Sequence, residues 1–345
     1  MFASPADLGE FKYVTRTSKN LSETGYARSR RIPAGSTLFV CIGSTIGKVG
    51  LAKEDMTANQ QINAVIPGPT VDCEYLYYAS TTLSAKVRSL AGEQAVPLMN
   101  KSAFSEFEIP FPPMPEQRAI ASALADADEL IATLERLIGK KQAIRQGIMQ
   151  QLLTGKTRLL GFAEPWVKRP FSEVMARVNA KRHQIPASTY REVGRLPVVD
   201  QGKESIVGYT DRTSAAMSPG LAGVIVFGDH TCITKFVDFD FAVGADGTQV
   251  LRAAPGVSAR FVSYVLELDP VASTGYNRHF KFLREKTLLL PPIHEQNAVA
   301  EVIRDFDDEI IATEARLAKA KAVKQGMVQQ LLSGRTRLAI EEGVT

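Results

Sequence analysis

The chain has 345 residues, and its 41 lysines and arginines against 37 aspartates and glutamates give a formal net charge of +4. This length suggests two or three domains, and a hydrophobic content of 45% is sufficient for well-packed cores. No run of 18 apolar residues occurs and no secretion signal opens the chain, so we expect neither membrane insertion nor export. Three scattered cysteines without a CxxC pair indicate reduced thiols in a cytoplasmic protein.

Residues 1–111 form a first globular segment. Short apolar runs broken by glycine, proline and asparagine predict the strands of a twisted sheet. The runs are Ser36–Ile42, Val49–Ala52 and Ala64–Ile66. A helix is expected over Tyr75–Ser89, and a strand over Phe107–Phe111 is expected to lead into a pair of prolines.

Residues 112–160 form a long helix. The segment Pro112–Leu159 recurs without a gap as Pro291–Leu338, and 22 of the 48 positions are identical. The chain therefore contains two copies of one unit, each a globular segment followed by a long helix. Glu116 suits the first helical turn, and Gly155 is expected to cap the helix at its C-terminus.

Residues 161–290 form a second globular segment with the same kind of pattern. Its expected strands are Gly223–Phe227, Phe239–Val243, Thr248–Ala253 and Thr287–Leu290. A helix is expected over Ala259–Leu268, and Arg260–Tyr264 is faintly similar to Glu74–Tyr78 of the first segment. The two segments otherwise differ strongly. Matched helices with unmatched globular domains indicate a fixed frame that carries two independent specificities.

Residues 291–338 form the second long helix, and residues 339–345 are a tail. In both helices the apolar residues are spaced alternately by three and four, which predicts a heptad seam. The seam residues are Leu124, Ile131, Leu134 and Ile138 in the first helix and Ile303, Phe306, Ile310 and Leu317 in the second.

Two partners are possible for these seams. Each helix could pack on its own globular segment, or the two helices could pair with each other, which we favour because the seams are long. One compact domain joins the end of the first helix to the start of the second, so the pair is expected to be antiparallel. The predicted fold is α+β, with two mixed α/β domains held apart by an antiparallel helix pair and an internal pseudo-twofold repeat.

Four motifs together resemble the specificity subunits of type I restriction-modification systems. They are the PPxxEQ helix entries Pro112–Gln117 and Pro291–Gln296, the helix exits QGIMQQLLTGKTRL and QGMVQQLLSGRTRL, the loop GSTIGKVG at 43–50, and Glu164-Pro165-Trp166. The resemblance covers nearly the whole chain. One departure is that the 30 residues Trp166–Arg195 have no counterpart ahead of the first domain, which is therefore expected to be short at its N-terminus.

The resemblance implies a non-catalytic, cytoplasmic subunit that takes part in defence against foreign DNA. Two target-recognition domains would each read one half of a bipartite site on double-stranded DNA. The helices would dock two methyltransferase subunits, and restriction and translocase subunits would join the complex. No cofactor is expected in this chain, because S-adenosylmethionine, ATP and magnesium would be bound by the partner subunits.

Enzymatic alternatives have little support in the residues. Gly43–Val49 resembles a phosphate loop, but it has three residues between its glycines instead of four and a valine where a hydroxyl would reach magnesium. The histidines do not pair at helical spacing, so no metal site is expected. They are His183, His230, His279 and His294. Two alternatives stay open: a scaffold that binds only proteins, and an enzyme with its own methyltransferase or nuclease site.

Basic residues in loops are the candidates for contacts with DNA, although a solvated charged surface would look the same. Clusters with serine, threonine and amide neighbours suit phosphates. These candidates are Lys19, Arg28, Arg30, Arg31, Lys48, Lys181, Arg182, His183, Arg278 and Lys281. Polar residues at predicted strand ends or turns are candidates for base edges. They are Ser44, Thr45, Asn59, Gln60, Tyr209, Arg212, His230 and Thr231.

Overall fold

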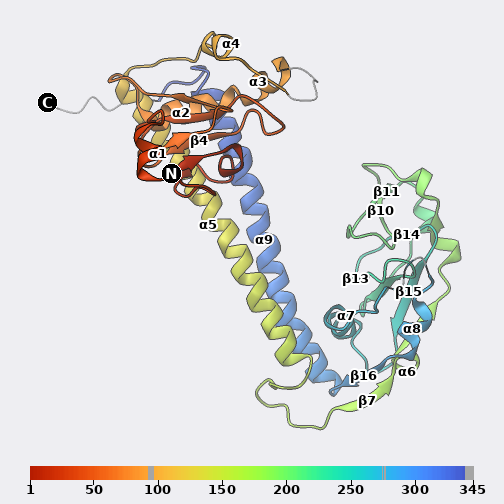
Figure 1. Cartoon of the computed structure of the whole chain (residues 1–345). Helices are drawn as coiled ribbons and strands as arrows, with labels where there is room; N and C mark the ends of the chain where they lie inside the picture. The colour runs from red at the N-terminus through yellow and green to blue at the C-terminus, as the bar shows by residue number, and fades with distance from the viewer. Residues whose placement is uncertain (92–96, 274, 276, 339–345) are drawn as a thin grey trace. The chain divides into compact units, whose positions relative to one another are not determined.

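The computed structural model describes residues 1–91, 97–273, 275 and 277–338. The chain divides into two compact units, Met1–Arg136 with Glu314–Thr345, and Leu137–Thr313. Each unit contains one globular domain and part of each long helix (Figure 1). Within the described part of the chain, no helix is both long and apolar enough to cross a membrane.

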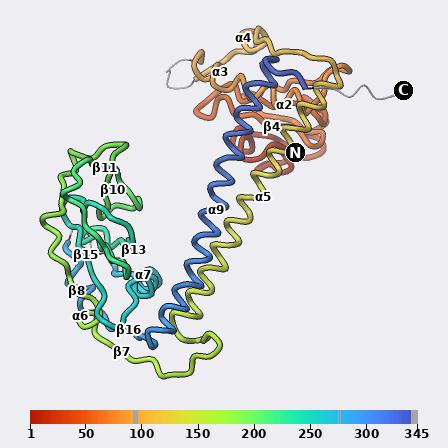
Figure 2. The backbone as a smooth tube through the Cα atoms, turned by 180° about the vertical axis from the view of Figure 1, so that it is seen from behind, coloured from red at the N-terminus to blue at the C-terminus, as the bar shows by residue number. Residues whose placement is uncertain are grey.

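Both predicted long helices are present. They are α5, Met114–Leu152, and α9, Ile293–Leu331, each of 39 residues. In the first unit Asp128 of α5 pairs with Lys324 of α9, and Glu135, further along α5, pairs with Lys321, which comes earlier in α9, at 2.7 Å. In the second unit Lys141 pairs with Glu309, and Arg145, further along α5, pairs with the earlier Asp307. The helices are therefore antiparallel in each unit, as Figure 2 also shows.

The seam residues face the interior of the helix pair to different degrees. In the first unit Leu124 packs against Leu331, and in the second unit Ile303 packs in one core with Met149. Leu124, Leu134, Ile138, Ile303 and Ile310 are buried, whereas Ile131, Phe306 and Leu317 are half-buried. Burial of these aliphatic groups is the main apolar contribution to the pairing.

Charged residues interrupt both seams at equivalent positions. Arg145 pairs with Asp307, and Lys324, which is 179 residues further on than Arg145, pairs with Asp128. Each aspartate also accepts a hydrogen bond of 2.7 Å from a tyrosine of the neighbouring domain: Tyr264 donates to Asp307, and Tyr78 donates to Asp128. Burial, followed by these bonds to carboxylates, raises the pKa of both tyrosines. The same contact thus joins helix to helix and helix to domain.

The glutamate of each PPxxEQ motif lies in the interior and meets the exit of the other helix. Glu295 accepts two hydrogen bonds from Arg158, at 2.5 and 2.6 Å, and one of 3.2 Å from the indole N–H of Trp166. In the first unit Glu116 accepts two from Arg337 in the same way. The TRL sequence at the end of one long helix therefore binds the EQ sequence at the start of the other in both units. We call this contact, Arg158 with Glu295 and Arg337 with Glu116, the repeated clamp.

The glutamine of the motif ties the start of each long helix to an earlier helix of the same domain, α2 or α7. The side-chain oxygen of Gln117 accepts from the backbone N–H of Asp72 at 2.9 Å, and that of Gln296 accepts from Ser258 at 2.9 Å. Asp72 and Ser258 are themselves the N-cap residues of the helices that follow. This explains why the motif requires Gln after Glu.

The first domain is built on one four-stranded sheet, in the order β2-β4-β3-β6, and on a two-stranded parallel pair, β1-β5. Its strands are β1 Phe2–Ala3, β2 Tyr13–Val14, β3 Thr37–Val40, β4 Val49–Ala52, β5 Thr57–Ala58 and β6 Ile62–Val65. Its helices are η1 Pro5–Asp7, α1 Glu23–Ala27, α2 Cys73–Thr82, α3 Ser84–Leu90 and α4 Lys101–Ser105. Helix α2 packs between the sheet and the helix pair (Figure 1).

Two predictions for the first domain need correction. The helix expected over Tyr75–Ser89 is two helices, α2 and α3, which meet at Leu83. The strand expected over Phe107–Phe111 is wrong, because these residues are extended but pair with no strand of the described chain. An apolar run becomes a strand only where a partner supplies hydrogen bonds.

The second domain has two four-stranded sheets, β11-β10-β14-β9 and β13-β12-β15-β8, and an antiparallel pair, β16-β7. Its strands are β7 Val167–Pro170, β8 Met175–Val178, β9 Gln184–Ile185, β10 Leu196–Val199, β11 Gly208–Thr210, β12 Val224–Gly228, β13 Thr234–Val237, β14 Ala242–Gly244, β15 Thr248–Ala253 and β16 Thr287–Leu290. Its helices are α6 Phe171–Val174, η2 Lys181–His183, η3 Ala187–Thr189, η4 Thr213–Ala215, α7 Ala259–Leu268 and α8 Phe280–Glu285.

The predicted elements of the second domain fall on β12, β14, β15, β16 and α7, and the α+β fold class is confirmed. Topology relates the two domains more clearly than sequence does. The parallel pair β10-β14 corresponds to β1-β5, and the hairpin β12-β13 with β15 corresponds to β3-β4 with β6. Helix α7 packs against the helix pair as α2 does.

Candidate nucleic-acid interface

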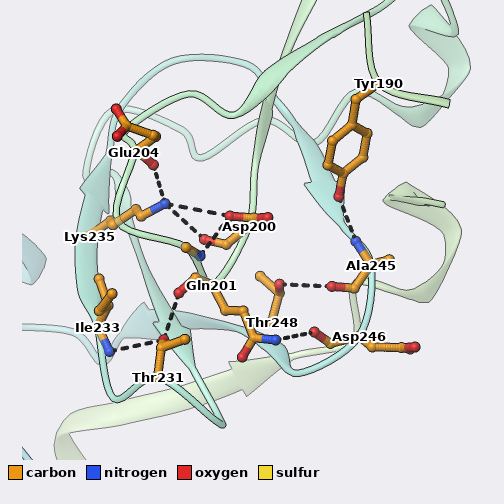
Figure 3. Close-up of polar contacts among 11 residues, drawn as sticks. Tyr190, Asp200, Gln201, Glu204, Thr231, Ile233, Lys235, Ala245, Asp246 and Thr248 are labelled. Carbon is orange, nitrogen blue, oxygen red and sulfur yellow. Dashed lines mark hydrogen bonds and ion pairs between the residues drawn. The ribbon is translucent and has the colours of Figure 1, made fainter. Parts of the chain in front are cut away.

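Three loops meet at one end of the second domain, and we call them the three-loop cluster. They comprise residues 200–204 after β10, 229–233 between β12 and β13, and 245–247 between β14 and β15. Gln201 connects all three: its amide donates to the backbone oxygen of Asp246 at 3.0 Å and accepts from the backbone N–H of His230 at 3.2 Å. Its backbone oxygen accepts from the Thr231 hydroxyl at 2.6 Å (Figure 3).

Lys235 of β13 stabilises the loop 200–204. Its ammonium group donates to the backbone oxygens of Asp200, at 3.0 Å, and of Glu204, and lies 3.9 Å from the Asp200 carboxylate (Figure 3). Burial lowers the pKa of Lys235, and the charge of Asp200 partly opposes that shift. This lysine therefore orders the loop and does not project toward a ligand.

The loops approach one another closely, and their backbone is strained. Cys232, with φ of 60°, and Asp246, with φ of 20°, are the non-glycine residues with positive φ in the described chain. Gly244 and Gly247 have no room for a Cβ, because Asp200 occupies that space at Gly244, and His230 and Gln201 occupy it at Gly247. Such strain persists only where the surroundings fix it, and it is concentrated at functional sites.

Basic candidates lie around this cluster. Lys181 lines a groove of about 310 Å³ together with Thr248 and Gln249. Arg278 precedes His279, whose backbone N–H donates to the backbone oxygen of Asp229 at 2.8 Å. The structure therefore places an exposed lysine and an exposed arginine beside two of the three loops.

Two further basic candidates differ in their surroundings. Arg182 is exposed, and its guanidinium donates to His183 at 2.8 Å. His183 is buried, with its other ring nitrogen 3.3 Å from the backbone oxygen of Ala215, so the structure places it in the interior. Lys281 is exposed on α8, with its ammonium group 4.7 Å from the ring of Phe282.

The two remaining candidates of this domain lie at β11, the edge of the other sheet. Tyr209 is half-buried, and its backbone exchanges two hydrogen bonds with Arg191, at 2.8 and 2.9 Å. Arg212 is exposed in the turn that begins η4, where it is free of the sheet ladder. Within the domain β11 lies at the end away from β7 and β16 (Figure 1).

The first domain repeats the arrangement with different residues. The loop 41–48 corresponds to 229–233, and the turn 59–61 corresponds to 245–247. Gln61 joins them, since its backbone oxygen accepts from Cys41 at 2.8 Å and its amide reaches the backbone oxygen of Ile42 at 3.4 Å. Asn59 in turn accepts a bond of 2.6 Å from the backbone N–H of Gln61.

The base-edge candidates of the first domain therefore lie together. Ser44 and Gln60 are exposed, and Thr45 and Asn59 are half-buried, in these two adjoining segments. The segment Gly43–Val49 joins two antiparallel strands, whereas a phosphate loop leads from a strand into a helix.

The phosphate candidates of the first domain are more dispersed. Lys19 is exposed and its backbone oxygen accepts from Phe2, beside the turn 59–61. Arg30 lines an apolar groove next to β6, and the guanidinium of Arg31 lies 5.6 Å from the ring of Tyr26. Lys48 is half-buried and faces a hollow beside α3, and Arg28 is exposed at the end of α1.

Sequence reasoning missed the residues that organise the cluster, chiefly Gln201 and Lys235. A signal for Gln201 was available in the turn DQGKES, which follows a buried apolar strand, whereas Lys235 lies within β13 and gave none. Among the described residues, no group of three or more His, Cys, Asp or Glu side chains could hold a metal ion.

Comparison with known proteins shows what the chain is similar to. Residues 3–146 match the family model described as the type I restriction modification DNA specificity domain. The chain is 35% identical over 133 residues to the MjaIX specificity subunit of Methanocaldococcus jannaschii, which covers 37% of this chain and 31% of that subunit. It is 25% identical over 376 residues to the putative MjaX specificity subunit of the same organism, with 97% and 85% covered.

The fold is also that of solved specificity subunits. The type I S subunit of Mycoplasma genitalium matches with a TM-score of 0.66 at 16% identity, over 96% of this chain and 91% of that one. The resemblance inferred from the motifs is thus confirmed. Over residues 3–146 the chain is similar to the DNA specificity domain of type I restriction-modification systems, and it has the fold of a solved specificity subunit.

Proposed function

We propose that this chain is the DNA-recognition subunit of a type I restriction-modification complex and that each globular domain reads one half of a bipartite site. The supporting observation is that two topologically equivalent loop arrangements, with unlike residues, are mounted on one repeated helix frame. A single shared ligand would favour like residues in the two loop sets. Two different half-sites favour unlike ones.

The chemistry of the loops suits DNA. Exposed hydroxyl and amide groups such as Ser44, Gln60 and Thr231 can bond base edges, and exposed Lys181 and Arg278 can neutralise phosphates. The cluster is ordered by internal hydrogen bonds, so its exposed groups would be held in position before DNA binds.

We further propose that the helix pair docks two methyltransferase subunits, with restriction and translocase subunits joining them, in the cytoplasm. S-adenosylmethionine, ATP and magnesium would then act in those partners, and this chain would position the reaction without catalysing it. One observation supports this division of labour: the repeated clamp residues keep the two helix ends alike although the domains have diverged.

Exchange of one domain tests the proposal. Residues 161–290 are replaced by the second domain of another family member, and the methylated sequence is mapped in a host that carries the complete system. One half of the site should change and the other should stay. If both halves change, or if the assembled complex retains no DNA at moderate salt, the chain is not a two-part reader but a protein scaffold or a different device.

A further inference from the structure

A polar groove of about 310 Å³ adjoins the three-loop cluster. It lies between the end of β8, the turn that contains η2, and the start of β15. The loop 245–247 of the cluster leads directly into Thr248 of β15, whose hydroxyl donates to the backbone oxygen of Ala245 at 3.4 Å (Figure 3). The groove and its walls belong entirely to the second unit. A ligand that contacts the cluster can therefore extend into the groove.

The polar side chains around the groove are basic groups, amides and one hydroxyl, without a carboxylate. The lining residues are Arg177, Val178, Asn179, Ala180, Lys181, Gln184, Thr248 and Gln249. Arg177 and Lys181 are exposed, and neither forms an ion pair with another residue of the described part of the chain. Cations without an internal counter-charge favour an anion, and amides suit a ligand that carries both hydrogen-bond donors and acceptors. Nucleic acid offers all three groups.

Gln184 is the amide of the groove that the fold leaves available. Its backbone lies in β9, where it pairs with Val243 of β14. The next residue, Ile185, is buried in the core, and successive side chains of a strand point to opposite faces. Gln184 is half-buried in the wall of the groove, and its side chain forms no hydrogen bond within the described ranges. The sheet therefore holds a free donor and a free acceptor in one place.

Gln249, the other glutamine of the groove, is already positioned by the protein. Its amide nitrogen donates to the buried carboxylate of Asp229 at 3.4 Å. The first domain has the same contact at the equivalent register position, where the amide of Asn63 donates to the sulfur of Cys41 at 3.1 Å. This repetition assigns Gln249 to the positioning of the loop that follows β12. Gln184 is left as the glutamine that can bind a ligand.

We propose that the groove receives the edge of one adenine from the half-site of the second domain, with Gln184 as the base-reading residue. Arg177 and Lys181 contact the flanking phosphates. The assignment rests on the proposed function and specifies how one base pair is read. A glutamine amide binds adenine in the major groove with two hydrogen bonds, since its oxygen accepts from N6 and its nitrogen donates to N7. The two cations are exposed whereas Gln184 is half-buried, as expected if phosphates flank an inserted base edge.

The first test uses the assembled complex and unmethylated duplexes in which each base pair of the methylated site is changed in turn. Gln184→Ala should weaken binding to the cognate duplex by about 5- to 150-fold, as expected for the loss of one bidentate base contact. The variant should lose its preference at one A·T pair, in one half of the site, and keep its preference at every other position. Thermal unfolding should match that of the unaltered chain, because the Gln184 side chain bonds no described residue.

A duplex with 7-deazaadenine at that A·T pair tests the contact directly. The analogue lacks the N7 acceptor, so the unaltered complex should bind it more weakly than the cognate duplex. Gln184→Ala has already lost the contact and should bind both duplexes equally. Such non-additivity is expected only where the two altered groups interact.

Two further variants separate base reading from phosphate binding. Arg177→Ala should lower the slope of log affinity against log salt by roughly 1 and leave every base preference unchanged, because phosphate contacts carry no sequence information. Gln150→Ala, at an exposed glutamine of α5 outside the groove, is the matched control for Gln184→Ala. It should leave both the affinity and the base preferences unchanged.

Three outcomes would overturn the assignment and leave the proposed function intact. The first is full preference at every position in Gln184→Ala. The second is an equal loss on cognate and scrambled duplexes, which would mean that Gln184 contacts no base. The third is loss of preference at a G·C pair in Arg177→Ala or Lys181→Ala, which would mean that the groove reads guanine. If the unaltered complex shows no base preference at all, the proposed function itself is wrong, and the assignment fails with it.

Discussion

The two helix ends and the two loop clusters of this chain have diverged to very different extents. At the helix ends the same contacts recur, with Glu116 and Arg337 in one unit and Glu295 and Arg158 in the other. In the loop clusters the topology recurs, but residues such as Gln201 have no like counterpart. The contacts at the helix ends use the same residue types in both copies, whereas the loops carry different residues on the same topology. Specificity can therefore diverge while assembly is kept.

Substitutions in the seam between the two long helices should have the largest effect on the free energy of unfolding. Ile310→Asn should lower the free energy of unfolding by about 2–5 kcal/mol, because it removes a buried aliphatic side chain and buries an amide in its place. Ile131, its repeat equivalent, is half-buried, so Ile131→Asn should cost less. Denaturant unfolding of both variants measures the difference. Neutral results at both positions would contradict the pairing of the seams.

The charged pairs within the helix frame should give the next largest effect, and they sharpen the comparison between repeats. Arg145 bonds two carboxylates, Asp307 and Glu267, the latter at 2.7 and 3.0 Å. Arg145→Met should therefore lower the free energy of unfolding by about 1.5–3 kcal/mol, as expected for lost bonds between charged groups. Lys324 bonds one carboxylate, so Lys324→Met should cost less. Equal losses, measured by denaturant unfolding, would show that the second carboxylate contributes nothing.

The parts of the fold that sequence predicts well are those with local signals. Two copies of one helix motif, with Gly155 and Gly334 as caps at φ of 71° and 72°, can be identified from spacing alone. The prediction of a strand over Phe107–Phe111 was wrong because a strand forms only where a second strand supplies hydrogen bonds. That second strand can be far away in the sequence. Periodicity carries no information on that partner.

The sequence predicted which loops form the candidate site, but it did not predict what each residue of those loops does. The turns that carry Ser44 and Thr231 were identified because polar residues follow buried strands. The burial of His183 depends on Ala215, 32 residues away, and the role of Gln201 depends on contacts with two other loops. Such contacts arise from the fold, so single residues gave no signal of them.

Base reading by the loops should give a smaller effect that is confined to one DNA sequence. If Arg212 or His230 contacts a base edge, its replacement by alanine should weaken binding of the assembled complex to the cognate site by about 1–3 kcal/mol. Binding to random DNA should change little, because such binding depends on phosphates. Titration on cognate and scrambled duplexes separates the two terms. Equal losses on both duplexes would assign the residue to the phosphate backbone.

The smallest expected effect concerns phosphate contacts. It distinguishes loop residues that contact phosphates from loop residues that contact base edges. Lys181, Arg182, Arg278 and Lys281 are exposed in the second domain. If each neutralises one phosphate, replacement of one by alanine should lower the slope of log affinity against log salt by roughly 1. Sequence preference should be retained, because phosphate contacts position the protein without reading bases.

Lys168, exposed on β7, is the matched control, and its replacement by alanine should leave the slope unchanged. Titration of the assembled complex at several salt concentrations measures the slopes. If all four replacements leave the slope unchanged, these side chains are a solvated surface, and phosphate binding has to be sought elsewhere on the domain.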